Sequence, residues 1–149
     1  MNSIYDNVAN EAMITRINKL NPDSKALWGK MKVDQMLSHC MAPIDLAIGN
    51  SEIKVNFMIR IFGRLLKKKI VNSNEFKKNS LTAPSFIRKK DYDFEKTKSD
   101  LINKFSSFSK LKHQAIKNTK HPIFGKMGYE EWDKLQWMHL DHHLKQFGV

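Results

Sequence analysis

The chain of 149 residues is 41% hydrophobic and 28% charged, a composition that suits one domain with an apolar core and excludes a disordered protein. No apolar stretch approaches the roughly 20 residues that cross a bilayer, the first residues show no secretory pattern, and the single Cys40 rules out an internal disulfide. The net charge is +11, and we expect one cytoplasmic domain over residues 1–149.

Two amphipathic helices are predicted in the first third of the chain. Residues 4–20 repeat apolar side chains at three- and four-residue steps: Val8, Ala12, Met13, Ile17 and Leu20. A turn at residues 21–24 precedes a second helix at about 32–47, which ends before Gly49 and Asn50. The residues predicted to face inward from it are Val33, Met36, Leu37, Cys40, Ile44 and Ala47.

The segment at about 53–70 predicts a basic amphipathic helix. Its apolar face consists of Phe57, Met58, Ile61, Phe62, Leu65 and Leu66, and its basic face of Arg60, Arg64, Lys67 and Lys68. Residues 54–90 contain eleven Lys and Arg against one acid, so almost all of the net charge lies in this quarter of the chain. We favour an apolar face that packs on the other helices, with the charges solvated.

The basic segment 54–90 also allows other functions. The alternative to packing is a non-catalytic bundle whose basic helix docks on an anionic membrane surface or an acidic partner. Nucleic-acid binding is disfavoured, because no stacking aromatic residues are interleaved with the basic runs. Positive potential near a pocket would also attract an anionic substrate.

The last part of the chain predicts two further helices and an all-α fold. After a loop at 72–92, a helix at about 93–110 turns Phe94, Leu101, Ile102, Phe105 and Phe108 inward. A connection with two glycines and a proline leads to a last helix at about 129–147, for which Gly128 can serve as N-cap. Four main helices, with the basic helix between the second and third, predict a bundle.

Three histidines near the end of the last predicted helix, in HLDHHLKQFG, form a candidate metal site. His139 and His143 are four residues apart, which places them about one turn apart on nearly the same face, a spacing that suits one metal ion. His142 is a weaker substitute, and the third ligand must come from another helix, where His39 is the first candidate. Spacing alone leaves a solvated cluster at the helix C-terminus as an equal alternative.

The stretches LWGKMKVDQMLSHC, HPIFGKMGYEEW and LQWMHLDHHLKQFG resemble the DUF1569 branch of the DinB/YfiT-like superfamily of metalloenzymes over nearly the whole chain. The resemblance implies a DinB-like four-helix bundle in which His39, His139 and His143 hold one divalent metal ion, such as Zn, Ni or Fe. Relatives tend to have Ser or Thr at the start of the last helix, where this chain has Gly128. Many related bundles pair, so a homodimer is compatible with the resemblance.

Three nitrogen ligands leave at least one coordination position open, which is the pattern of a catalytic metal site. We therefore predict a metal-dependent enzyme that acts on a small molecule, which is anionic or a thiol. Superfamily relatives include thiol-dependent transferases, while hydrolase-like chemistry needs the same ligands, so the reaction stays open. Asp141 lies between the ligands in sequence but on the far side of the helix, and we predict no catalytic base.

Four further residues are candidates to support or line the site. Gln35, Gln136 and Gln146 lie one turn from a candidate ligand and can accept the N–H of an imidazole, although each can equally face solvent. Trp132 shares a face with His139 and either walls a pocket or packs in the core. Cys40 is predicted to pack in the core.

Overall fold

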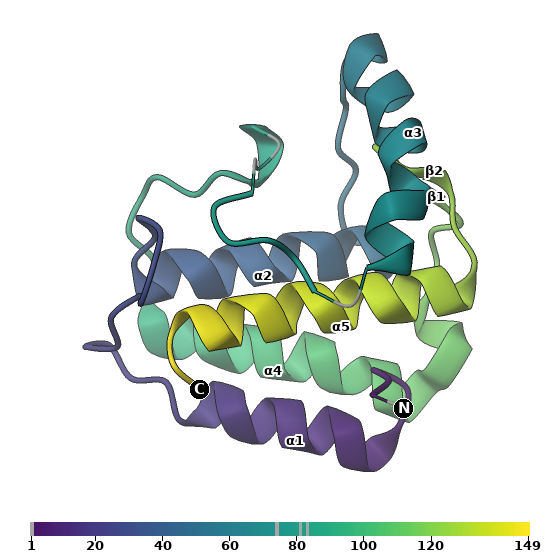
Figure 1. The fold of residues 1–149 in the computed structure, drawn as a ribbon. Helices are drawn as coiled ribbons and strands as arrows, with labels where there is room; N and C mark the ends of the chain where they lie inside the picture. The colour runs from purple at the N-terminus through teal and green to yellow at the C-terminus, as the bar shows by residue number, and fades with distance from the viewer. Residues whose placement is uncertain (1, 74, 81, 83) are drawn as a thin grey trace.

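The computed structural model describes residues 2–73, 75–80, 82 and 84–149, and it is mostly helical. Its α-helices are α1 (Asn7–Asn18), α2 (Val33–Ala47), α3 (Phe57–Asn72), α4 (Phe94–Leu111) and α5 (Tyr129–Gln146). Helices α1, α2, α4 and α5 lie side by side along a common direction, whereas α3 rises from them at a steep angle (Figure 1). The all-α prediction is confirmed.

The connections between the helices contain short regular elements. One 3-10 turn (Pro84–Phe86) lies in the predicted loop between α3 and α4, and another (Lys112–Ala115) follows α4. Strands β1 (Lys120–His121) and β2 (Gly125–Lys126) then form an antiparallel hairpin in which His121 pairs with Gly125. The sequence predicted no strand here, because two residues are too few to show a period of two.

The helix starts are set by local hydrogen bonds to otherwise unpaired N–H groups. The N-cap side chains that accept such bonds are Asp6 in α1, Asn56 in α3 and Asp93 in α4. Helix α5 begins after Gly128, as predicted, and the Glu131 carboxylate accepts the Gly128 N–H at 2.9 Å. A Ser or Thr at this N-cap is therefore not required to hold the Gly128 backbone.

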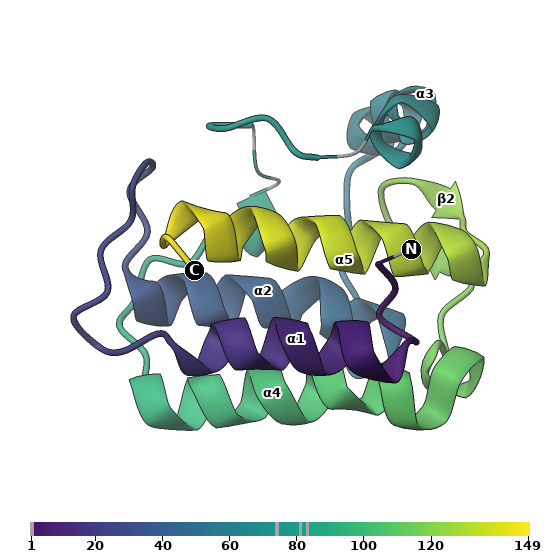
Figure 2. The same ribbon diagram turned by 60° about the horizontal axis from the view of Figure 1, so that its bottom comes forward.

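The apolar core lies between α1, α2, α4 and α5. All six residues predicted to face inward from α2 are buried, and so are most of its other residues, because this helix is covered on several sides. The large side chains at its centre, each exposed by less than 2%, include Trp132, Phe105, Phe108, Leu101, Met36 and Leu37. This packing holds α2 and α5 against each other along their length (Figure 2).

The prediction for α1 was wrong in part. Met13, Ile17 and Leu20 are buried, but Val8 is 80% exposed and Ala12 also faces solvent. The inner face of α1 instead includes buried Asn10, whose amide donates to the carbonyl oxygens of Ile4 and Phe105 at 2.9 and 3.1 Å. Both N–H groups of this buried amide have a hydrogen-bond acceptor, so its burial carries little cost. A polar residue can therefore occupy a position that hydrophobicity alone assigns to the surface.

The prediction that α3 packs its apolar face on the bundle was wrong. Its six large apolar residues are exposed by 39% (Ile61) to 72% (Leu65), and the helix contacts α5 and β2 through its opposite side. Gly63 lies in that contact, where a Cβ atom would come within 2.3 Å of Ile123. Across the described part of the chain, none of the helices combines the length and the apolar character needed to cross a membrane.

Candidate metal centre

The structure brings together His39 from α2 with His139 and His143 from α5. Their ring centroids are 4.8, 4.7 and 4.7 Å apart, which is close to an equilateral triangle. One nitrogen of each ring lies within 4.8 Å of the corresponding nitrogens of the other two. His39 and His143 are buried and His139 is partly buried, so the cluster lies at the inner side of the α2–α5 contact.

The orientation of the His39 ring is fixed by a backbone carbonyl. Its Nδ1 lies 2.9 Å from the carbonyl oxygen of Phe86, which can only accept a hydrogen bond. Nδ1 therefore carries the proton, and in the neutral ring Nε2 presents a lone pair. This Nε2 faces Nε2 of His139 at 3.0 Å.

The orientation of His143 is fixed by Gln146. The Gln146 Nε2 donates to the carbonyl oxygen of Trp28 at 2.7 Å, which leaves its Oε1 as the acceptor of a hydrogen bond from His143 Nδ1 at 2.8 Å. The proton of His143 therefore lies on Nδ1, and its Nε2 carries the lone pair that can bind a metal ion. Gly29 has a φ of +82°, and a Cβ there would lie 2.5 Å from Gln146 Nε2, so glycine provides the room for this amide.

The surroundings of the three histidines favour their neutral forms. Burial lowers the pKa of His143 to about 3, with a smaller contribution from charge on His39. Burial also lowers the pKa of His39 and holds the pKa of His139 well below its usual range, where charge on His143 and His39 adds to the effect. At neutral pH all three imidazoles are therefore neutral, with one ring nitrogen of each unprotonated, and this is the form that binds a metal ion.

Three other residues singled out in the sequence bond elsewhere. Gln35 accepts the Lys32 N–H at 3.1 Å, and Gln136 donates to the Pro43 carbonyl oxygen at 2.8 Å. Trp132 is fully buried and donates to a backbone carbonyl 14 residues away at 2.8 Å. These contacts support the ends and the packing of α2 and α5, and they reach backbone groups instead of the three imidazoles.

Two residues that adjoin the ligands in sequence are held outside the cluster. Cys40 is buried with its sulfur 3.6 Å from Met36 Sδ, and burial raises the pKa of its thiol. Burial alone would raise the pKa of Asp141, but hydrogen bonds from Lys145 and Arg16 outweigh burial and lower it. Since Arg16 belongs to α1, the Asp141 carboxylate faces away from the histidines and stays ionised.

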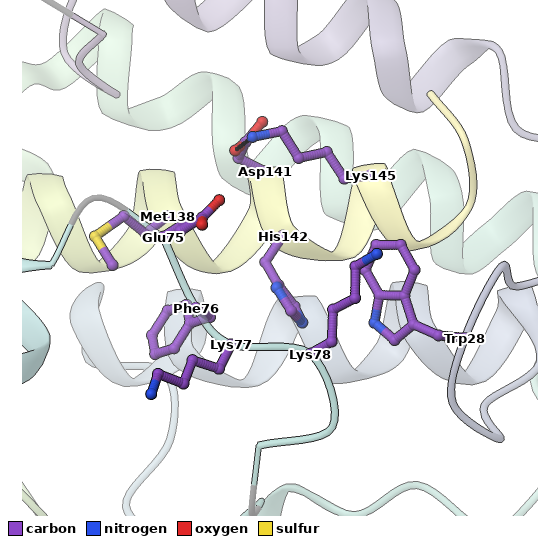
Figure 3. Close-up of a pocket in the computed structure, with 9 residues that line it drawn as sticks. All are labelled: Trp28, Glu75, Phe76, Lys77, Lys78, Met138, Asp141, His142 and Lys145. Carbon is purple, nitrogen blue, oxygen red and sulfur yellow. Dashed lines mark ion pairs between the residues drawn. The ribbon is translucent and has the colours of Figure 1, made fainter.

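A cavity of about 140 Å³ adjoins the cluster at His142 (Figure 3). The half-buried His142 ring lies 5.1 Å from that of His143 and 5.8 Å from that of Trp28. Phe76 lies edge-on to both His139 and His142, each at 6.1 Å. The cavity therefore has aromatic walls, formed by Trp28, Phe76 and His142, and it reaches the three clustered histidines only through the contacts of Phe76 and His142 with them.

The cavity is also lined by five charged side chains, the cations Lys77, Lys78 and Lys145 and the carboxylates Glu75 and Asp141. Lys78 lies over the Trp28 ring, with Nζ 4.3 Å from its centroid. Lys145 forms an ion pair with Asp141 at 2.8 Å, while Lys77 and Lys78 are exposed. Since Asp141 pairs with Lys145, the remaining charges are Lys77, Lys78 and Glu75, an excess of one cation beside aromatic walls that suits a small molecule with an apolar part and a negative group.

Sequence reasoning missed the groups that orient the histidines. The Phe86 and Trp28 carbonyl oxygens are backbone atoms, so no residue type identifies them. Gly29 carries the only local signal, because glycine is favoured wherever φ is positive. Phe76 lies in a segment without periodicity, and it was not singled out.

One comparison with known proteins gives a match. A family model described as "Protein of unknown function (DUF1569)" matches residues 5–148, a span that includes all three histidines and every described helix. No curated protein and no solved structure matches the chain significantly.

Proposed function

The chain belongs to the DUF1569 family, and we propose that it is a divalent-metal-dependent enzyme that acts on a small molecule. His39, His139 and His143 would hold the ion. The observation that carries this proposal is the fixed tautomer of two of these rings: Phe86 and Gln146 hold the Nδ1 protons, so the Nε2 atoms of His39 and His143 present lone pairs inside the protein. A shared cation would bind both lone pairs, and at His39 it would replace the hydrogen bond from His139 Nε2.

We also propose that α1, α2, α4 and α5 form a DinB-like bundle. The positions of the histidines support this: one lies midway along the second helix and two lie one turn apart near the end of the last helix. These are the places that the superfamily pattern gives to its metal ligands. The basic helix α3 is then an insertion between the second and third helices of the bundle.

The donor set fits a catalytic metal better than a structural one. Three imidazole nitrogens suit zinc, nickel or iron, and they leave at least one coordination position open. A divalent ion held there supplies acidity to a water molecule or to a thiol. Both thiol-dependent transfer and hydrolysis are compatible with this set of ligands.

The cavity residues would bind the substrate beside the ligands. Lys77 and Lys78 would attract a negative group of the substrate, while Phe76 and Trp28 would exclude water from its apolar part. Gln146 would keep the His143 ring oriented through the hydrogen bond to Nδ1. The side chains of the protein would thus bind the substrate and orient the His143 ring, and the metal ion would supply the acidity.

Metal analysis of protein purified without a histidine tag tests the proposal. We expect about one equivalent of divalent metal after reconstitution and dialysis, and less than about one tenth of that in His139→Ala and His143→Ala. His113→Ala is the matched control, because His113 is exposed and stacks on Tyr129 at the other end of α5. Failure of the native chain to retain any metal, or equal retention in all variants, would show the proposal to be wrong.

A further inference from the structure

Helix α3 presents a large apolar surface to solvent. We define the α3 apolar face as Phe57, Met58, Ile61, Phe62, Leu65 and Leu66, which are exposed by 71, 56, 39, 56, 72 and 48%. At 100° per residue these six side chains cover about half of the helix circumference. Contiguous exposed patches of this kind mark membrane or protein contacts on soluble domains.

The outward direction of this face is set by contacts on the other side of α3. Gly63 approaches Ile123 so closely that a Cβ would lie 2.3 Å from its side chain and 2.6 Å from its carbonyl oxygen. One turn further, the partly buried Lys67 pairs with Glu131 at 2.8 Å and also bonds the Lys126 carbonyl. A rotation that buried the α3 apolar face would break the ion pair and bring larger side chains against Ile123.

Positive charge borders the α3 apolar face. On the helix, Arg64 and Lys68 lie next to Phe57 and Ile61 along one edge, and Lys69 lies on the apolar side in the last turn. All three are exposed. From residue 53 to residue 73 the sequence contains no Asp or Glu, so the surface carries charge of one sign.

We infer that α3 docks on an anionic membrane surface, with the α3 apolar face at the boundary of the acyl chains and the basic border among the lipid phosphates. Helices that lie at membrane interfaces have this composition, with apolar side chains on one side and Lys and Arg along the edge of that side. Figure 1 shows α3 projecting away from the four packed helices, so a flat surface can reach it. This inference does not depend on the metal centre.

A second copy of the chain fits this surface less well. Two α3 apolar faces packed against each other would gather Arg64, Lys68 and Lys69 of both copies at one interface, and α3 has no acid to pair with them. A protein partner would have to provide an apolar groove with an acidic rim around a projecting helix. Anionic lipids supply the apolar phase and the negative charge together.

Vesicle co-sedimentation of the full chain tests the inference. The probes are vesicles of phosphatidylcholine alone and of phosphatidylcholine with about 30% phosphatidylserine. We expect at least tenfold tighter binding to the anionic vesicles at low salt, and weaker binding as salt is raised, because the basic border is screened. Absence of binding to anionic vesicles would overturn the inference without affecting the metal centre.

Two variants separate the apolar and the electrostatic contributions to vesicle binding. We expect Phe62→Ser combined with Leu65→Ser to weaken binding at least tenfold, although every basic residue is kept. Arg64→Gln, Lys68→Gln and Lys69→Gln together should weaken it as much. Because all five side chains are exposed, folding is retained, and the thermal midpoint checks this.

Matched controls alter the same residue types elsewhere on the surface. Val8→Ser with Leu111→Ser removes two exposed apolar side chains from α1 and α4, and Lys19→Gln, Lys25→Gln and Lys110→Gln remove three exposed cations. Both controls should bind as the native chain does. Equal losses in controls and α3 variants would overturn the inference, as would a dimer that ignores vesicles and dissociates on Leu65→Ser.

Discussion

His39 Nε2 and His139 Nε2 lie 3.0 Å apart, although 100 positions separate these residues in the chain. Since the Phe86 carbonyl holds the His39 proton on Nδ1, the His39 Nε2 lone pair faces His139. In the metal-free protein His139 Nε2 must therefore carry the proton between them. A metal ion held by these rings would take the place of this proton, so metal binding and acid would compete at the same atoms.

Removal of the Gln146 amide is expected to weaken the metal centre. In Gln146→Ala the His143 Nδ1 loses its acceptor and the ring loses its fixed tautomer, so metal affinity should fall about 10- to 100-fold. Chelator competition measures this affinity. Gln136→Ala is the control, because it removes a buried amide of α5 that bonds the Pro43 carbonyl; an equal loss of affinity there would contradict a specific role for Gln146.

Gly29→Ala should affect stability and metal binding together. The φ of +82° disfavours alanine, and its Cβ would lie 2.5 Å from Gln146 Nε2 and displace the amide. We expect a loss of about 1–2 kcal/mol in the free energy of unfolding of the metal-free protein, measured in urea. Metal affinity should fall in the same direction as in Gln146→Ala. Unchanged stability and affinity would show that Gly29 does not position this amide.

His121 is expected to make the folded state sensitive to acid. It is 4% exposed, its Nδ1 accepts the N–H groups of Ile123 and Phe124, and burial lowers its pKa to about 4. The unfolded chain takes up this proton near pH 6.5, so between pH 6.5 and 4 the unfolded state binds more protons and stability falls as the pH is lowered. The stabilisation is fully present above pH 6.5, and about 3 kcal/mol is lost by pH 4.

Urea unfolding of metal-free protein at pH 7 and at pH 4.5 measures this effect. His121→Gln should show a smaller loss of stability between the two pH values than the native chain, because the titrating group is absent. The three clustered histidines make the same contribution to the pH dependence of both proteins. The difference between native chain and variant in the loss of unfolding free energy from pH 7 to pH 4.5 therefore isolates His121. An equal loss of unfolding free energy in the two proteins would indicate that His121 does not contribute to the acid sensitivity.

The sequence predicted the fold and the candidate ligands where a fixed spacing carries the information. The repeat in α2 identified six buried residues, and the interval of four between His139 and His143 placed both on one side of α5. The approach of His39 to that pair came from family resemblance. No spacing rule relates residues on two helices that are 100 positions apart.

The orientation of α3 could not be predicted from periodicity. The repeat shows which residues share a face, but the choice between packing that face and exposing it depends on what neighbours meet the helix. The decisive residue is Gly63, which allows close contact with Ile123 on the basic side. A glycine opposite an apolar stripe was a signal for this arrangement, and the apolar stripe alone pointed to the wrong one.

X-ray absorption spectroscopy of the metal-reconstituted chain tests the central claim most directly. With zinc bound, we predict about three imidazole nitrogens at roughly 2.0–2.1 Å, and fewer imidazoles in His39→Ala. Such a spectrum reports the ligand type and number without requiring a known substrate. A spectrum with oxygen ligands only, or one that His39→Ala leaves unchanged, would contradict a metal centre built from His39, His139 and His143.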